Sequence, residues 1–124
     1  MSNFLVKKED KYTVISVTVN KLDSGVSPDL KSELVLINSE GEKNIIIDLS
    51  LCKYCDSSGL SAVLIGKRLC TSAEGSFILS GLQDSVSKLI AISQLDTVLS
   101  ITPTLDEAVQ LLYMEEVERD IDKE

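Results

Sequence analysis

The chain has 124 residues, of which 44% are hydrophobic and 26% charged, and its net charge is −8. This length and composition predict one globular domain with an ordinary hydrophobic core. Histidine is absent, which excludes Ser-His and Cys-His nucleophile pairs, the common histidine metal ligand and the usual proton shuttle near neutral pH.

Half of the net charge lies in residues 113–124, which hold six acids against two bases. The rest is mildly acidic and has no basic patch of the kind that binds nucleic acid or an anionic membrane. The sequence has neither a signal-like nor a membrane-spanning apolar run, and no glycine-rich nucleotide-binding motif. We therefore expect no nucleic-acid partner, no membrane insertion, no cofactor and no metabolic catalysis. The three cysteines are interpreted as cytoplasmic thiols.

The first third of the chain predicts a strand pair and a helix. Extended runs at 4–8 and 12–19 flank a short polar connection, and apolar residues alternate with polar ones in the second run. After a turn-rich loop, Ser27 is predicted to cap a helix that has Pro28 at its first position and ends at Gly41.

The central part of the chain carries the strongest pattern. Ile45–Ile47 is a short β-branched run that is apolar on both faces, which predicts a strand in the middle of a sheet. A polar turn follows, and Asp56 or Ser57 supplies the side-chain oxygen that begins a helix continuing to about Cys70. Because backbone N–H groups and the positive end of the helix dipole meet at such a corner, we expect the function to reside there.

The last third predicts two further strands, each followed by a helix. The strands are expected at 76–79 and 97–101, and Asp84 can cap the short helix between them. Thr104 and Glu107 form a capping box for the final helix.

Within that final helix, Glu115 and Arg119 can pair at i, i+4. The predicted order is β-β-α-β-α-β-α-β-α, an α/β fold with a mixed, mostly parallel sheet of about five strands. The domain is expected to span residues 1–114, with 115–124 as an acidic helix end or tail.

The central strand 45–50 and the following Asp56-Ser57-Ser58-Gly59-Leu60 resemble the signature of the STAS family, which is named for sulfate transporters and anti-sigma factor antagonists. Upstream, Leu22-Asp23 resembles the Leu-Asp of that family before its first helix. Downstream, 95–109 resembles its closing strand and helix, so the resemblance covers nearly the whole chain. Cys52 and Cys55 depart from the family's pattern, which usually has plain apolar residues in this loop.

The resemblance implies a small non-enzymatic switch. In bacterial members of the anti-sigma antagonist type, the serine directly after the aspartate is phosphorylated by an anti-sigma factor that is itself a serine kinase. The unphosphorylated form binds this kinase and so frees a sigma factor, and a serine phosphatase resets the switch. By position the phosphorylated residue is Ser57, with Asp56, Asp23 and Ser58 as its neighbours. The alternative interpretation is that Ser57 only caps the helix, which is the usual role of a serine at such a position.

The helix after the corner suggests a surface for the partner. At about 100° per residue, Leu60 and Leu64 fall near Lys67 on a predicted solvent face. The opposite, core face is expected to hold Ala62, Ile65, Gly66, Leu69 and Cys70. The predicted partner-binding residues are Asp23, Asp56, Ser58, Gly59, Leu60, Leu64 and Lys67. In the alternative interpretation, a neighbouring loop covers the two leucines.

Two other functions remain open. One is a STAS subunit of a lipid or anion transport complex, which binds its partners without being phosphorylated. The other is a thiol-disulfide oxidoreductase, because Cys52 and Cys55 have C-x-x-C spacing between a strand and a helix. Against it, Asp56 and Ser57 separate the second cysteine from the helix, and no proline precedes a late strand. A zinc site is less favoured still. Zinc takes four ligands, and with three cysteines and no histidine the fourth ligand would have to be a carboxylate.

Overall fold

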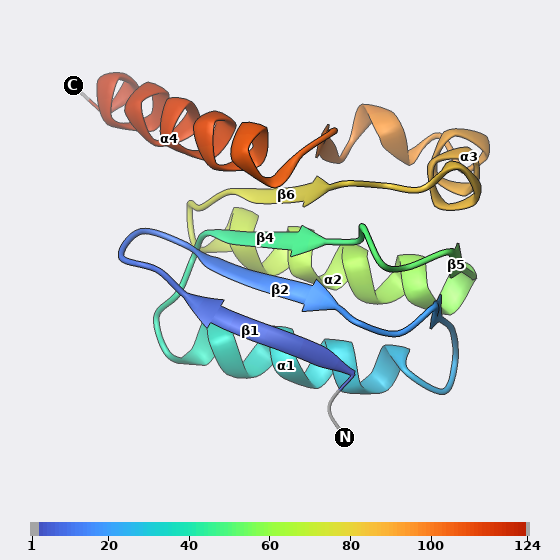
Figure 1. Cartoon of the computed structure of the whole chain (residues 1–124). Coiled ribbons are helices and arrows are strands. Elements are labelled where there is room, and N and C mark those ends of the chain that lie inside the picture. The colour runs from blue at the N-terminus through green and yellow to red at the C-terminus, as the bar shows by residue number, and fades with distance from the viewer. Residues whose placement is uncertain (1–2, 124) are drawn as a thin grey trace.

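Residues 3–123 are described by a computed structural model, in which a five-stranded sheet has helices on both faces (Figure 1). From one edge to the other, the strands are β1 (Phe4–Lys8), β2 (Thr13–Val17), β4 (Ile45–Asp48), β6 (Phe77–Ser80) and β7 (Ser100–Thr102). β1 is antiparallel to β2, and the other neighbouring pairs are parallel. The predicted α/β fold with a mixed, mostly parallel sheet is confirmed.

The helices form two unequal layers. α1 (Ser27–Ser39) and α2 (Ser57–Ser72) lie on one face of the sheet, and α4 (Leu105–Asp122) lies on the other (Figure 1). α3 (Asp84–Ile92) contacts β5 (Tyr54–Cys55), and the short 3₁₀ helix η1 (Leu95–Thr97) follows α3. The nine predicted strands and helices therefore occur in the predicted order, and the structure adds further short elements between them.

The apolar side chains of the central strand β4 explain why helices must pack on both faces of the sheet. Ile45, Ile46 and Ile47 are all fully buried. Ile45 and Ile47 belong to the larger core under α1 and α2, whereas Ile46 packs with Ala108 and Leu112 of α4. Side chains of a strand alternate between faces, so this apolar run requires a helix layer on each side.

A second, two-stranded sheet was not predicted. It pairs β3 (Lys21–Leu22) with β5 in parallel, and Asp56 N–H donates to the carbonyl of Leu22. The pairing ties the loop before α1 to the start of α2, and these two segments form the corner at which we expect the function.

Two of the predicted helix caps are wrong. The hydroxyl of Ser27 donates to the carbonyl of Asp23 at 2.6 Å, and the residue before α1 is Val26. Asp84 lies in the first turn of α3, where its negative charge interacts favourably with the positive end of the helix dipole. Its side chain does not cap the helix. Thr104 does cap α4, since its hydroxyl accepts from the N–H of Glu107.

The last predicted strand, 97–101, is displaced along the chain. Its first residue belongs to η1, and β7 occupies Ser100–Thr102. β7 pairs with Ile78, Leu79 and Ser80, the last three residues of β6, and this pairing sets its position.

The C-terminal half of α4 is held by polar contacts that replace the predicted Glu115–Arg119 pair. Arg119 donates to Ser76 Oγ at 3.0 Å, and Asn44 Nδ2 donates to Glu116 Oε1 at 2.7 Å. These contacts attach α4 to the start of the central strands. Within residues 3–123, no helix is both long and apolar enough to cross a membrane.

Candidate functional site

The corner between β5 and α2 is built on the carboxylate of Asp56. Asp56 is the cap of α2, and its Oδ1 accepts hydrogen bonds from Gly59 N–H at 3.0 Å and from the Ser58 hydroxyl at 2.6 Å. The Ser58 hydrogen bond is the main cause that lowers the pKa of Asp56, with a further contribution from the Gly59 N–H. Of the two predicted caps, Asp56 is therefore the one found.

Two consecutive serines at this corner have opposite environments. Ser58 is half-buried, donates to Asp56, and lies 3.4 Å from the hydroxyl of Ser27. Ser57 is exposed at the first position of α2, and its hydroxyl has no hydrogen-bond partner within residues 3–123. The Ser57 hydroxyl is thus free to meet an incoming molecule, whereas Ser58 is engaged inside the corner.

The loop with Asp23 lies beside Asp56. The carboxylate of Asp23 accepts a hydrogen bond from Gly25 N–H at 3.0 Å. The N–H of Ser24, in the same loop, helps to lower the pKa of Asp56. Asp23 therefore shapes the loop next to the corner.

Gly59 fits the corner because it lacks a side chain. A Cβ atom at this position would overlap the carbonyl of Leu22 and the sulfur of Cys55. Gly59 is buried and offers no exposed surface, and its lack of a side chain lets β3 approach α2 closely.

A groove with a volume of about 290 Å³ runs from Ser57 along α2. It is lined by Ser57, Leu60, Ser61, Leu64, Ile65, Arg68, Ser93 and Leu95. Its far wall, formed by the residues after α3, was missed from the sequence, because no local pattern indicates which distant loop lies against α2.

The prediction that Leu60 and Leu64 lie on a solvent-exposed face of α2 is wrong for Leu60 and only partly right for Leu64. Leu60 is only 6% exposed, and Leu64 is half-buried and packs against the core. The alternative, that a neighbouring segment covers these leucines, is the better description. On the predicted core face, Ala62, Gly66 and Cys70 are buried, whereas Ile65 and Leu69 are half-buried.

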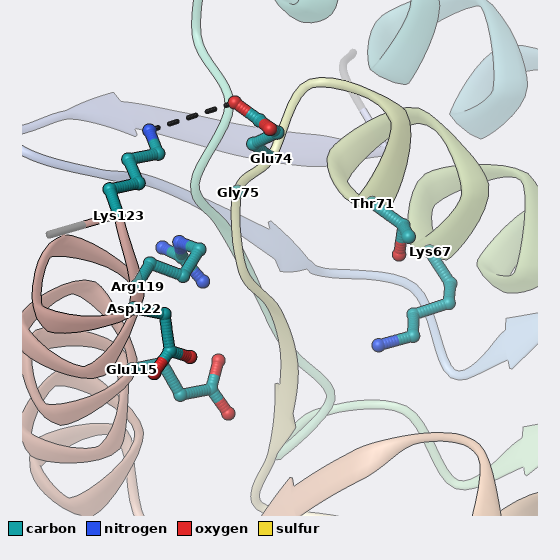
Figure 2. A pocket seen from close by; sticks show the side chains of 8 residues that line it. All are labelled: Lys67, Thr71, Glu74, Gly75, Glu115, Arg119, Asp122 and Lys123. Carbon is teal, nitrogen blue, oxygen red and sulfur yellow. Dashed lines mark ion pairs between the residues drawn. The ribbon is translucent and has the colours of Figure 1, made fainter.

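Lys67 lies in a different pocket from Leu60 and Leu64 (Figure 2). This pocket, about 440 Å³ in volume, separates the C-terminal halves of α2 and α4. It is lined by Lys67, Thr71, Glu74, Gly75, Glu115, Arg119, Asp122 and Lys123. Figure 2 shows Lys67 and Thr71 on one side and the α4 residues on the other. The predicted grouping of Lys67 with the two leucines is not found.

The cysteines have the chemistry of buried, inert thiols. Cys52 and Cys55 are free and buried, and their sulfurs face the carbonyls of Tyr54 and Asp56. Burial raises the pKa of Cys52, and it raises the pKa of Cys55 to about 12. A redox thiol needs a lowered pKa, so these thiols lack the property that the oxidoreductase hypothesis requires. Among residues 3–123, no cluster of His, Cys, Asp or Glu could hold a metal ion.

The chain is thus a small α/β domain in which a capped helix, an exposed serine and an adjoining groove lie at one corner. The sequence matches the family model described as the STAS domain over residues 3–108, and the chain belongs to this family.

Solved structures share the fold. An anti-sigma factor antagonist from Mycobacterium paratuberculosis is 24% identical with a TM-score of 0.80, covering 89% of this chain and 92% of that one. The phosphorylated form of SpoIIAA, a Bacillus cell fate determinant, is 22% identical with a TM-score of 0.68, covering 86% and 96%. A sulfate transporter family protein from Wolinella succinogenes is 19% identical with a TM-score of 0.72, covering 88% of each chain. At these identities the likeness concerns the fold.

Proposed function

We propose that this STAS domain is an anti-sigma factor antagonist whose binding is switched by phosphorylation of Ser57. The unphosphorylated domain binds a cognate anti-sigma factor with serine kinase activity, and this releases a sigma factor. The kinase transfers the terminal phosphoryl group of ATP to Ser57 Oγ, with release of ADP and the hydroxyl proton. A serine phosphatase then hydrolyses the phosphate ester and restores the free hydroxyl.

The observation that carries this proposal is the contrast between the two serines. Ser57 is exposed and its hydroxyl is free, whereas the Ser58 hydroxyl is bound to Asp56. A kinase can therefore reach the Ser57 hydroxyl without breaking any hydrogen bond of the corner. Phosphorylation of Ser58 would remove the donor that holds Asp56 in its capping position.

The position of Ser57 also explains how a phosphate would act. A phosphoryl group adds about two negative charges at pH 7. The N-terminus of α2 can accept that charge because the helix dipole is positive there, so the domain should stay folded. A partner seated over the corner would have to bury the charge, and binding is lost for that reason.

The groove beside Ser57 is the surface we propose for the kinase. It combines the apolar side chains of Leu64, Ile65 and Leu95 with the charged side chain of Arg68. Ser57 lines the same groove, so a phosphate on it would stand at the edge of the contact.

A transport-complex subunit is the second candidate, because a sulfate transporter family protein shares the fold. In that case the same groove would bind its partner without phosphorylation. The two proposals differ in whether Ser57 accepts phosphate, and a mass measurement can separate them.

The test combines the native chain and the variants Ser57→Ala, Ser57→Asp and Ser58→Ala with ATP and the anti-sigma serine kinases encoded in the same genome. Intact mass and peptide mapping record phosphate, and gel filtration records the complex. We expect phosphate on the native chain and on Ser58→Ala, none on Ser57→Ala, and weaker kinase binding by Ser57→Asp. Phosphate on Ser57→Ala at the native rate would refute the assignment of Ser57. If no kinase phosphorylates the native chain, the transport-subunit proposal takes precedence.

A further inference from the structure

The outer face of α4 carries an exposed apolar stripe, at one edge of which Tyr113 packs edge-on against the ring of Tyr12. The stripe consists of Tyr113, Met114, Val117 and Ile121, whose exposed fractions are 42%, 60%, 57% and 62%. At 100° per residue these four side chains share an arc of about 100°, so they form one continuous face of the helix. We call this surface the α4 stripe.

The stripe is not the face by which α4 packs on the sheet. That inner face uses Ala108 and Leu112, which are fully buried against Ile46 and Ile78. α4 is therefore apolar on two sides, and only one of them is used in the domain. A helix with a second apolar face exposed in this way marks a surface for another molecule.

Acidic residues border the stripe on both sides. On the same helical wheel, Asp120 lies along one edge, and Glu107 and Glu118 lie along the other. Asp106 lies in line with the stripe, about two turns before Tyr113. All four are exposed.

The basic residues of α4 do not offset this charge on the outer face. Arg119 donates to Ser76, and Lys123, just after the helix, pairs with Glu74 at 3.6 Å (Figure 2). Both side chains thus have partners on the side of α4 that faces the pocket between α2 and α4. The exposed charged residues of α4 that border the stripe are therefore acidic.

We propose that the α4 stripe binds a positively charged amphipathic helix of a partner protein. Apolar residues at i, i+4 and i+7 of such a helix would cover Met114, Val117 and Ile121, and lysines or arginines beside them would face the acids. Two copies of this chain packed stripe to stripe would set acid against acid, which disfavours a homodimer. An anionic membrane surface is repelled for the same reason.

This surface is separate from the phosphorylation site. α4 and α2 lie on opposite faces of the sheet (Figure 1). The stripe also lies wholly beyond residues 3–108, the part that matches the STAS family model. The inference therefore does not depend on the proposed switch, and a failure of one leaves the other standing.

The probe is a fluorescent peptide of about 18 residues, or about five helical turns, with leucine along one face and lysine elsewhere. Binding to the full chain is measured by fluorescence anisotropy. We expect the triple variant Met114→Gln/Val117→Gln/Ile121→Gln to bind about tenfold more weakly than the native chain, because the buried apolar area is lost. Neutralising the border with Glu118→Gln/Asp120→Asn should also weaken binding and reduce its dependence on salt.

Matched variants control for general attraction between opposite charges. Val35→Gln/Leu36→Gln removes two apolar side chains of similar exposure on α1, and Asp10→Asn/Asp29→Asn removes two exposed acids elsewhere. Both should bind the peptide as the native chain does, and a peptide with glutamate in place of lysine should not bind.

Three results would overturn the proposal. The first is native affinity of the stripe variant, and the second is an equal loss of affinity in the matched controls. The third is a homodimer in sedimentation equilibrium that the stripe variant abolishes, since this would assign the stripe to a second copy. The stripe variant should keep the native thermal midpoint, because its substituted side chains are exposed.

Discussion

The hydroxyl of Ser58 donates to Asp56 Oδ1 at 2.6 Å, and this contact gives Ser58 a structural role that the neighbouring Ser57 does not have. The hydrogen bond holds the Asp56 carboxylate in the position from which it also accepts from Gly59 N–H and caps the N-terminus of α2. Ser57, one residue earlier in the chain, is left outside this arrangement. The stability of the corner and its proposed chemistry therefore depend on different serines.

The two serines should differ in their effect on stability. We expect Ser58→Ala to lower the midpoint of thermal unfolding by a few degrees, because a hydrogen bond that orients the cap of α2 is lost. Ser57→Ala should leave the midpoint nearly unchanged, since an exposed hydroxyl without a partner contributes little. Calorimetry of the two variants checks this, and equal losses would contradict the distinction between the serines.

Asp56 should make the domain less stable in acid. Its pKa is lower in the folded chain than in the unfolded chain, mainly because of the Ser58 hydrogen bond. The stabilisation is therefore present above the unfolded pKa of about 4 and is lost as the pH falls through the folded pKa.

The comparison is with Asp56→Asn, which keeps an oxygen acceptor but does not titrate in this range. Urea unfolding should show the native chain losing its advantage over Asp56→Asn as the pH falls from about 5 to about 3. A constant difference between the two proteins over that range would rule out Asp56 as the titrating group.

Much of the fold could be predicted because its signals are local. The run Ile45–Ile47 indicated a strand buried on both faces, and Thr104 with Glu107 indicated where the last helix begins. Both features depend on residues within a few positions of one another. β3 and β5 were missed because a strand of two residues has no periodicity.

The surroundings of the site were harder to predict, because they are set by contacts between distant segments. Leu60 was expected to be exposed, but it is buried and lies in a groove whose other wall includes Ser93 and Leu95. Arg119 was expected to pair within its own helix, yet its partner Ser76 lies 43 residues away in the sequence. A helical wheel contains no information about such neighbours.

Asn44 should be important for the attachment of α4. Its side chain is buried, accepts from Ser76 N–H at 2.8 Å, and donates to the carbonyl of Lys11 and to Glu116. We expect Asn44→Ala to lower the free energy of unfolding by about 2 kcal/mol, because buried polar groups lose their partners. Asn20→Ala, at an exposed position, is the control. A similar small loss in both variants, measured by urea unfolding, would show that the Asn44 contacts are dispensable.

The thiols should behave as structural residues. All three cysteines are buried, and burial raises the pKa of Cys55 and of Cys70 to about 12. In the folded chain we therefore expect each thiol to react with a disulfide reagent far more slowly than free cysteine does, and all three to react at once in denaturant. A single thiol that reacts faster than free cysteine in the folded chain would restore the oxidoreductase hypothesis.

Gly59 connects the packing of the corner to its proposed chemistry. A methyl group at this position would overlap the Leu22 carbonyl and the Cys55 sulfur, so β3 and α2 would have to move apart. We expect Gly59→Ala to cost about 2 kcal/mol of stability, in the range usual for overpacked cores, and to slow phosphorylation of Ser57 because the N-terminus of α2 is displaced. Gly25→Ala is the control, since the nearest atom to its added methyl group, Asp23 Oδ1, is at an ordinary 3.4 Å.

A second variant separates strain at Gly59 from other causes. Cys55→Ala in the Gly59→Ala background removes one of the two overlapping neighbours, so the double variant should lose less stability than the sum of the two single losses. Chemical unfolding of the four proteins in this cycle gives the coupling between positions 55 and 59. Additive losses would mean that the sulfur does not limit the space at Gly59. The Leu22 carbonyl, which no side-chain substitution removes, would then account for the requirement for glycine.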